Sequence, residues 1–170
     1  MKNISIRFTL LFILLVFLQI WLFGNINLFG FAAPLLYIYF IIKLPTGINR
    51  STILLLSALM GFIIDIFGGA LGLNMLVMVF SGFFRFYFVK LFAPRDIPDD
   101  CIPSFDAFGK FLFMRYAGVI TFIHISLLYM IESLSLFNPV LLSINIASSF
   151  VLTLALIFAF ESLNLDIFNK

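Results

Sequence analysis

The feature that most constrains this chain is a run of 35 residues without a charged side chain, which extends from Phe8 to Ile42. A single helix of that length would measure about 52 Å at 1.5 Å per residue, whereas the hydrocarbon core of a bilayer is about 30 Å thick. Glycine and asparagine residues interrupt the run near its middle, and Pro34 follows them. The run therefore predicts two membrane helices that are joined by a turn.

The composition also indicates that the chain lies in a lipid bilayer. Of the 170 residues, 64% are hydrophobic and 11% are charged, whereas soluble domains are about 45 to 50% apolar and about 25% charged. The ten Lys and Arg exceed the eight Asp and Glu by too little to suggest a nucleic-acid surface, and the single Cys101 allows no internal disulfide. We expect one integral membrane domain over residues 1–170, with its first apolar run retained because no signal-peptidase pattern follows it.

Charges, glycines and prolines divide the chain into six apolar segments. The stretch 93–110 contains three prolines and four aspartates and is predicted to be a loop, for which solvation or protein docking is favoured over divalent-cation binding. The first two segments are short, so a re-entrant pair is an alternative to two full crossings. The expected fold is all-α, a polytopic bundle of six transmembrane helices at about 8–23, 31–44, 51–67, 73–92, 111–131 and 139–160.

The basic residues predict the orientation. With six crossings, all ten Lys and Arg fall on the side of the amino terminus. Because basic residues in short loops stay in the cytoplasm, we expect both termini and the loop 93–110 to be cytoplasmic.

Asp65 is the first candidate functional residue, because a carboxylate near hydrocarbon usually has a partner or a role. Ser57, Gly61 and Asp65 follow at four-residue steps along one helix face, and small residues there let another helix approach closely. Asp65 is predicted to pin the following glycine turn and to make a partner contact; a ligand or ion site and a free interfacial group are the alternatives. The stripe is predicted to meet a second one on the next helix, made of Asn74, Met78, Ser81 and Arg85.

Other polar residues in the apolar segments are interpreted as packing residues. His124 lies at a depth similar to that of Asp65 and could pair with it, although a hydrogen bond between helices is favoured over catalysis or metal binding. Arg85 and Arg115 are predicted to extend their long side chains to the headgroups. The last helix carries a polar stripe that is predicted to form interhelical hydrogen bonds, made of Asn145, Ser149 and Thr153.

Enzyme motifs are missing from the sequence. The glycines Gly68, Gly69 and Gly72 are not followed by the Lys and Ser/Thr pair of a phosphate-binding loop, and neither G-x-S-x-G nor H-E-x-x-H occurs. We expect no catalytic, metal or cofactor site.

An ordered set of residues between positions 17 and 82 resembles the MreD family of rod shape-determining proteins, and the plan of six helices in about 170 residues agrees with it. The set is Phe17-Leu18-Gln19-Ile20-Trp21, Pro34, Leu44-Pro45, Met60-Gly61 followed by Asp65, and Leu71-Gly72.

The resemblance implies a fold similar to that of the substrate-binding subunits of energy-coupling-factor vitamin transporters. It also implies a non-enzymatic scaffold of the bacterial cell-elongation machinery in the cytoplasmic membrane, which binds MreC and links it to peptidoglycan synthesis, with RodA, the elongation transpeptidase and MreB as further possible partners. The positions expected to be architectural or partner-binding are Gln19, Pro34, Ser57, Gly61, Asp65, Gly72, Asn74 and Ser81.

The alternative function is that of a vitamin-binding transporter subunit. Those subunits resemble one another in an alanine-spaced stripe on the first helix, which docks the energising module. The segment 8–23 contains no alanine, so the scaffold is favoured.

Overall fold

The computed structural model describes residues 2–23, 33–70, 72–94, 98, 101–133 and 138–163, and every regular element in these ranges is a helix. Four of the helices are long and apolar enough to cross a membrane. The prediction of an all-helical, multi-pass membrane protein is thereby confirmed at this level. The four helices are α3 (Arg50–Gly68), α4 (Leu73–Phe92), α6 (Lys110–Glu132) and α7 (Pro139–Ser162).

Local backbone chemistry sets several of the helix ends. Gly69 ends α3 with φ of 68°, and Gly72 precedes α4 with φ of 80°, a left-handed conformation that glycine adopts without steric cost. At the start of α7, Pro139 occupies the first turn and the Asn138 side chain accepts two backbone N–H groups. Glycines and prolines such as these were used to separate the apolar segments in the sequence. The four long helices begin and end within two residues of the predicted bounds.

The remaining helices are shorter. α1 (Lys2–Leu18) continues into η1 (Gln19–Phe23), a π-helical turn. α2 (Ile38–Lys43) has six residues, and α5 (Phe105–Phe108) is a single turn inside the predicted loop 93–110.

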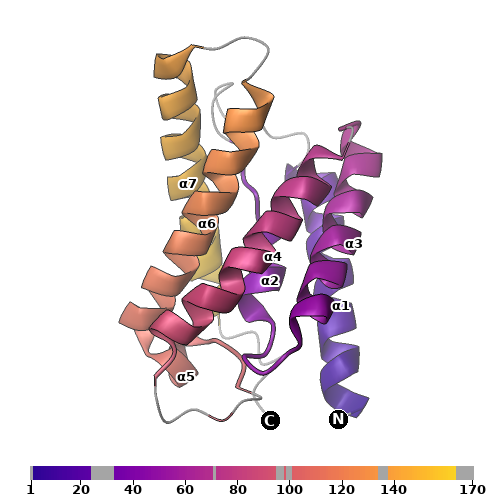
Figure 1. Ribbon diagram of the computed structural model, residues 1–170, viewed down its shortest axis with the longest axis vertical. Helices are drawn as coiled ribbons and strands as arrows, with labels where there is room; N and C mark the ends of the chain where they lie inside the picture. Colours follow the sequence, from indigo (N-terminus) through magenta and orange to yellow (C-terminus); the bar gives the residue numbers. More distant parts are fainter. Residues whose placement is uncertain are drawn as a thin grey trace.

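The long helices surround the segment 33–44. In Figure 1, α6 and α7 lie on one side, α1 and α3 on the other, and α2 lies in the middle. No residue from 35 to 44 is more than 7% exposed. This segment, and none of the long helices, forms the centre of the bundle. We call residues 33–44 the central segment.

The predicted helix at 31–44 is wrong in its first half. Residues 31 and 32 lie outside the described ranges, residues 33–35 have no regular structure, 36 and 37 form a turn, and the helix begins at Ile38. Buried non-helical backbone is tolerated where other groups of the protein satisfy its N–H and C=O groups. Side chains from η1 and α7 do so here, as described below.

The described basic residues gather toward one end of the bundle. The starts of α1, α3 and α6 and the ends of α4 and α7 all lie at the lower end in Figure 1. Arg7, Arg50, Lys90 and Lys110 each lie within two turns of these helix ends. We call this end of the molecule the basic end.

Candidate functional site

Gln19 holds the non-helical part of the segment 33–44. Its side-chain Nε2 donates to the carbonyl oxygen of Pro34 at 3.0 Å, and its Oε1 accepts from the backbone N–H of Leu36 at 3.0 Å. The amide thus serves as a hydrogen-bonding partner for backbone that makes no helical bonds. Gln19 is the first residue of the π-helical turn η1, a kind of irregularity that is frequent at functional positions.

Hydroxyl groups of α7 satisfy the backbone on the opposite side. The N–H of Ala33 donates to Ser149 Oγ at 3.1 Å, and the N–H of Leu35 donates to Thr153 Oγ1 at 3.2 Å. Ser149 also bonds to the hydroxyl of Tyr129 on α6 at 2.8 Å. Ser149 and Thr153 of the predicted stripe therefore bond mainly to the segment 33–44, and the bond of Ser149 to α6 is an addition. The third member, Asn145, does not take part, because its buried Oδ1 has no hydrogen-bond partner among the described residues.

Asp65 caps the start of α4. Its Oδ1 accepts from the backbone N–H and the side-chain Nδ2 of Asn74, both at 2.9 Å, and its Oδ2 accepts from the backbone N–H of Met75 at 2.8 Å. The first N–H groups of a helix have no intrahelical partner and carry the positive end of its dipole. A carboxylate that accepts three N–H bonds there is well compensated, so the pinning of the turn that the sequence predicted is what the structure contains.

A chain of hydrogen bonds leads from Asp65 across the centre of the bundle. The hydroxyl of Tyr37 donates to Asn74 Oδ1 at 2.8 Å, His124 Nε2 lies 2.9 Å from the same hydroxyl, and His124 Nδ1 lies 2.9 Å from Ser81 Oγ. His124 and Tyr37 are fully buried. His124 is therefore connected to Asp65 through two intermediate side chains and does not pair with it directly.

Donor and acceptor chemistry fixes the direction of this chain. Asn74 donates through Nδ2 to Asp65, so its Oδ1 faces Tyr37 and can only accept. The Tyr37 hydroxyl donates its single proton to Asn74, and its oxygen must accept from His124 Nε2–H. Beyond His124, the Nδ1 atom lies 2.9 Å from Ser81 Oγ, and the Ser81 hydroxyl donates to the carbonyl of Val77 at 2.8 Å. The arrangement orders five side chains around the central segment.

A buried ion pair anchors the basic end of the segment. Lys43 Nζ lies 2.9 Å from Glu161 Oε1, and both side chains are at most 6% exposed. Glu161 also accepts from the hydroxyl of Tyr39 at 2.6 Å and from the backbone N–H of Phe105, while Lys43 donates to the carbonyl of Pro103. The pair joins α2, α7 and the loop that precedes α6.

The structure contradicts the prediction that the Arg85 side chain extends to the headgroups. It is 1% exposed and does not extend to the headgroups; its guanidinium donates to the carbonyls of Leu44 and Pro45, just beyond the end of α2. Helix carboxyl ends carry partial negative charge, which a cation compensates. Arg115 is exposed and lies over the ring of Phe111 at 4.0 Å, a position compatible with the predicted extension.

Helix α4 packs against the small residues of the α3 stripe. A Cβ on Gly61 would lie 2.4 Å from Met75 Cα, and a Cβ on Gly82 would lie 2.5 Å from Ser57 Oγ. The two helices meet as predicted, but on α4 the contact residues are Asn74, Met75 and Gly82. Two members of the predicted α4 stripe face elsewhere, because Ser81 lies against His124 and Arg85 donates to carbonyls beyond α2. Ser57 and Gly61 are buried in this contact, so they are architectural and do not offer a surface to a partner helix.

Sequence reasoning missed three residues of the site. Tyr37 is one of five tyrosines in an apolar chain, and nothing in its neighbourhood marks it as the link between Asn74 and His124. Glu161 was recognisable as an acid at the end of an otherwise apolar segment, and Lys43 as the base that ends another. Their pairing depends on the fold, because 118 positions separate them.

Within the ranges described, no group of three or more His, Cys, Asp and Glu side chains is placed to share a metal ion. Comparison of the chain with protein-family models, with curated proteins and with solved structures gave no match.

Asp65→Asn should lower the free energy of unfolding by about 1–3 kcal/mol, because an asparagine side chain turns an NH₂ group toward at least one of three N–H donors. Thermal unfolding of the detergent-solubilised protein measures the loss. Glu132→Gln, the same acid-to-amide change at an exposed helix end, should change stability by less than about 0.5 kcal/mol. Equal effects of the two variants would contradict the capping role.

Proposed function

We propose that this chain is a non-enzymatic membrane scaffold of the cell-elongation machinery, of the MreD kind, and that it binds MreC. One observation carries the proposal: the buried polar side chains described above are used to hold the chain's own central segment. Three residues that the sequence predicted to be architectural or partner-binding form hydrogen bonds inside the protein. Gln19 bonds to the backbone of the central segment, and Asp65 bonds to Asn74. Such a site builds a rigid body with apolar outer faces.

Six crossings of the cytoplasmic membrane are part of the proposal, with residues 33–43 forming the second. This segment bonds to Ser149 at one end and to Glu161 at the other, which are 12 residues and about 18 Å apart along α7. Only Ile38–Lys43 of this segment is helical, so the span of the whole segment does not follow the helical rise of about 1.5 Å per residue. By the positive-inside rule, the basic end faces the cytoplasm.

The filled centre favours the scaffold over a vitamin-binding transporter subunit. A ligand site needs a cavity with polar groups directed into it. Here Tyr37, Tyr116 and His124 occupy the centre with no exposed surface, and the polar atoms of Tyr37 and His124 are directed at protein partners.

The outer face of α3 is our proposed contact for the membrane helix of MreC. Leu55, Leu59, Phe62 and Ile66 follow one face of α3 and are 49–71% exposed. Beside them, a groove of about 420 Å³ lies between α1, the end of α2 and α3, and its lining is apolar except for Thr9. A concave apolar surface next to a ridge of side chains suits the packing of another helix.

Site-specific photo-crosslinking tests this function. A photoreactive residue at Leu55, Leu59 or Phe62 should crosslink to MreC when the two proteins are co-expressed. The matched control is Met130, which is 56% exposed on α6 and should give no crosslink to MreC. The proposal fails if the α3 positions give none while the protein remains monodisperse, or if Met130 crosslinks equally well.

A further inference from the structure

Two cations at the basic end approach one aromatic ring. The Arg50 Cζ lies 3.6 Å from the centroid of the Phe86 ring, and Lys90 Nζ lies 4.7 Å from the same centroid. Both distances are in the range of a cation–π interaction. The two charges are therefore no more than about 8 Å apart. Both residues are exposed, and neither forms an ion pair with a residue of the described ranges.

The position of Arg50 adds to this concentration of positive charge. Arg50 is the first residue of α3, where the helix dipole already carries partial positive charge. The preceding residue, Asn49, makes no capping hydrogen bond with its side chain. Two cations and the amino terminus of α3 therefore lie close together, and no described anionic side chain forms an ion pair with either cation.

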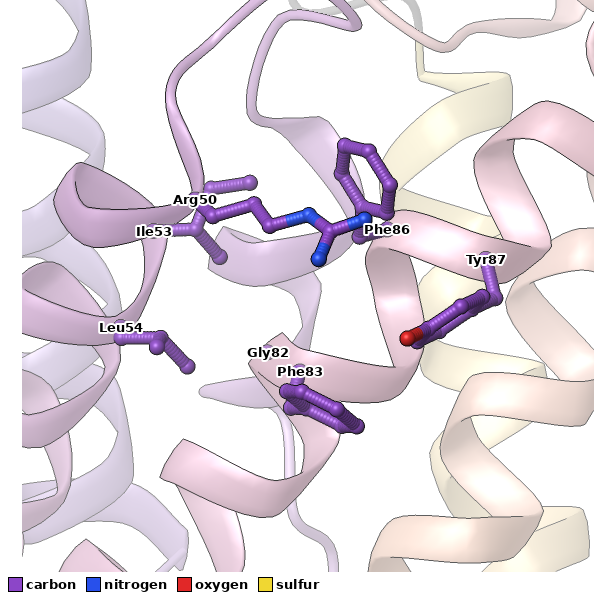
Figure 2. Close-up of a pocket in the computed structure, with 7 residues that line it drawn as sticks. All are labelled: Arg50, Ile53, Leu54, Gly82, Phe83, Phe86 and Tyr87. Atoms are coloured by element: carbon purple, nitrogen blue, oxygen red, sulfur yellow. The ribbon is translucent and has the colours of Figure 1, made fainter.

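A small pocket opens beside these charges. It has a volume of about 70 Å³ and lies between the start of α3 and the second half of α4. Figure 2 shows Arg50, with Ile53 and Leu54 of α3, facing the rings of Phe83, Phe86 and Tyr87 on α4. Phe83 and Tyr87 are 45% and 50% exposed. The lining is therefore apolar except for Arg50 and the Tyr87 hydroxyl, and the Lys90 ammonium group approaches the Phe86 ring of this lining from outside it.

We propose that the exposed cations Arg50 and Lys90 bind the phosphate headgroup of an anionic membrane lipid, and that the adjoining pocket receives part of its acyl chain. An amphiphile matches both parts of the site, because its phosphate neutralises the two cations while its acyl chain covers Leu54 and Phe83. The site lies at the ends of two membrane-length helices, which is where lipid phosphates are found. This inference does not depend on the scaffold function.

Native mass spectrometry of the full-length protein tests the site. The detergent-solubilised protein is titrated with phosphatidylglycerol, with phosphatidylcholine, or with inorganic phosphate as a soluble anion. We expect wild-type protein to retain one phosphatidylglycerol in preference to phosphatidylcholine. Each of Arg50→Gln and Lys90→Gln should weaken that binding about fivefold, and the double variant about thirtyfold.

Arg115→Gln is the matched control, because Arg115 is also an exposed arginine over a phenylalanine ring, but no second cation among the described residues approaches that ring. It should weaken binding less than twofold, and excess inorganic phosphate should not displace the lipid. If Arg115→Gln weakens binding as much as Arg50→Gln, or if the double variant binds like wild type, the site does not exist. Displacement by inorganic phosphate would also overturn the proposal, since a simple anion site would explain it. An unchanged melting temperature in phosphatidylcholine shows that the variants are folded.

Discussion

Replacing Gly61 with leucine should abolish the folded protein. A Cβ at this position would lie 2.4 Å from Met75 Cα and 2.6 Å from Asn74 O, and backbone atoms cannot move aside as a flexible side chain can. Ordinary overpacking costs about 1–3 kcal/mol. Here the helices themselves must separate, and the Asp65 cap on α4 is lost with them, so we expect a loss above about 3 kcal/mol.

Fluorescence-detected size exclusion in detergent measures this outcome as loss of the monodisperse peak. Gly118→Leu provides the control, because Gly118 lies inside the membrane-length helix α6 and a Cβ there meets nothing within 4 Å. This variant should remain folded with a melting temperature close to wild type. A folded Gly61→Leu protein would show that α3 and α4 do not pack as closely as described.

The four long helices could be predicted from the sequence because their ends are set locally. Gly69 and Gly72 adopt positive φ, Pro139 fits a first helical turn, and charged residues lie at or near several of the other ends. Each of these effects depends on a residue and its immediate neighbours. The meeting of α3 and α4 followed as well, since a short glycine turn leaves few other packings for two adjacent helices.

The segment 33–44 could not be predicted in this way. An apolar run in lipid favours helix, because a helix satisfies its own backbone. Here Gln19, Ser149 and Thr153 satisfy it instead, and two of these lie more than 115 positions away in the chain. Arg85 was misplaced for a related reason: its partners are the carbonyl groups of Leu44 and Pro45, which lie about 40 positions away in the chain and approach Arg85 only in the folded protein.

The second large effect is expected at the buried ion pair of Lys43 and Glu161. Glu161→Leu removes the carboxylate from a buried ammonium group and also the acceptor of Tyr39 and Phe105. Removing one partner of a buried pair costs about 3–5 kcal/mol. We expect Lys43→Met to cost less than Glu161→Leu, because the carboxylate that remains still accepts from Tyr39 and Phe105.

The double variant distinguishes a coupled pair from two independent packing positions. With both charges replaced by apolar groups of similar size, no buried charge is left without its counter-ion, so the Lys43→Met/Glu161→Leu protein should be more stable than Glu161→Leu alone. Unfolding in detergent, followed for the wild type, both single variants and the double variant, gives the coupling energy. Lys110→Met removes an exposed cation at the same end and should change stability by less than about 0.5 kcal/mol. Single effects that add within about 0.5 kcal/mol in the double variant would mean that the two charges do not depend on each other, and the anchoring of α2 to α7 would then rest on apolar packing.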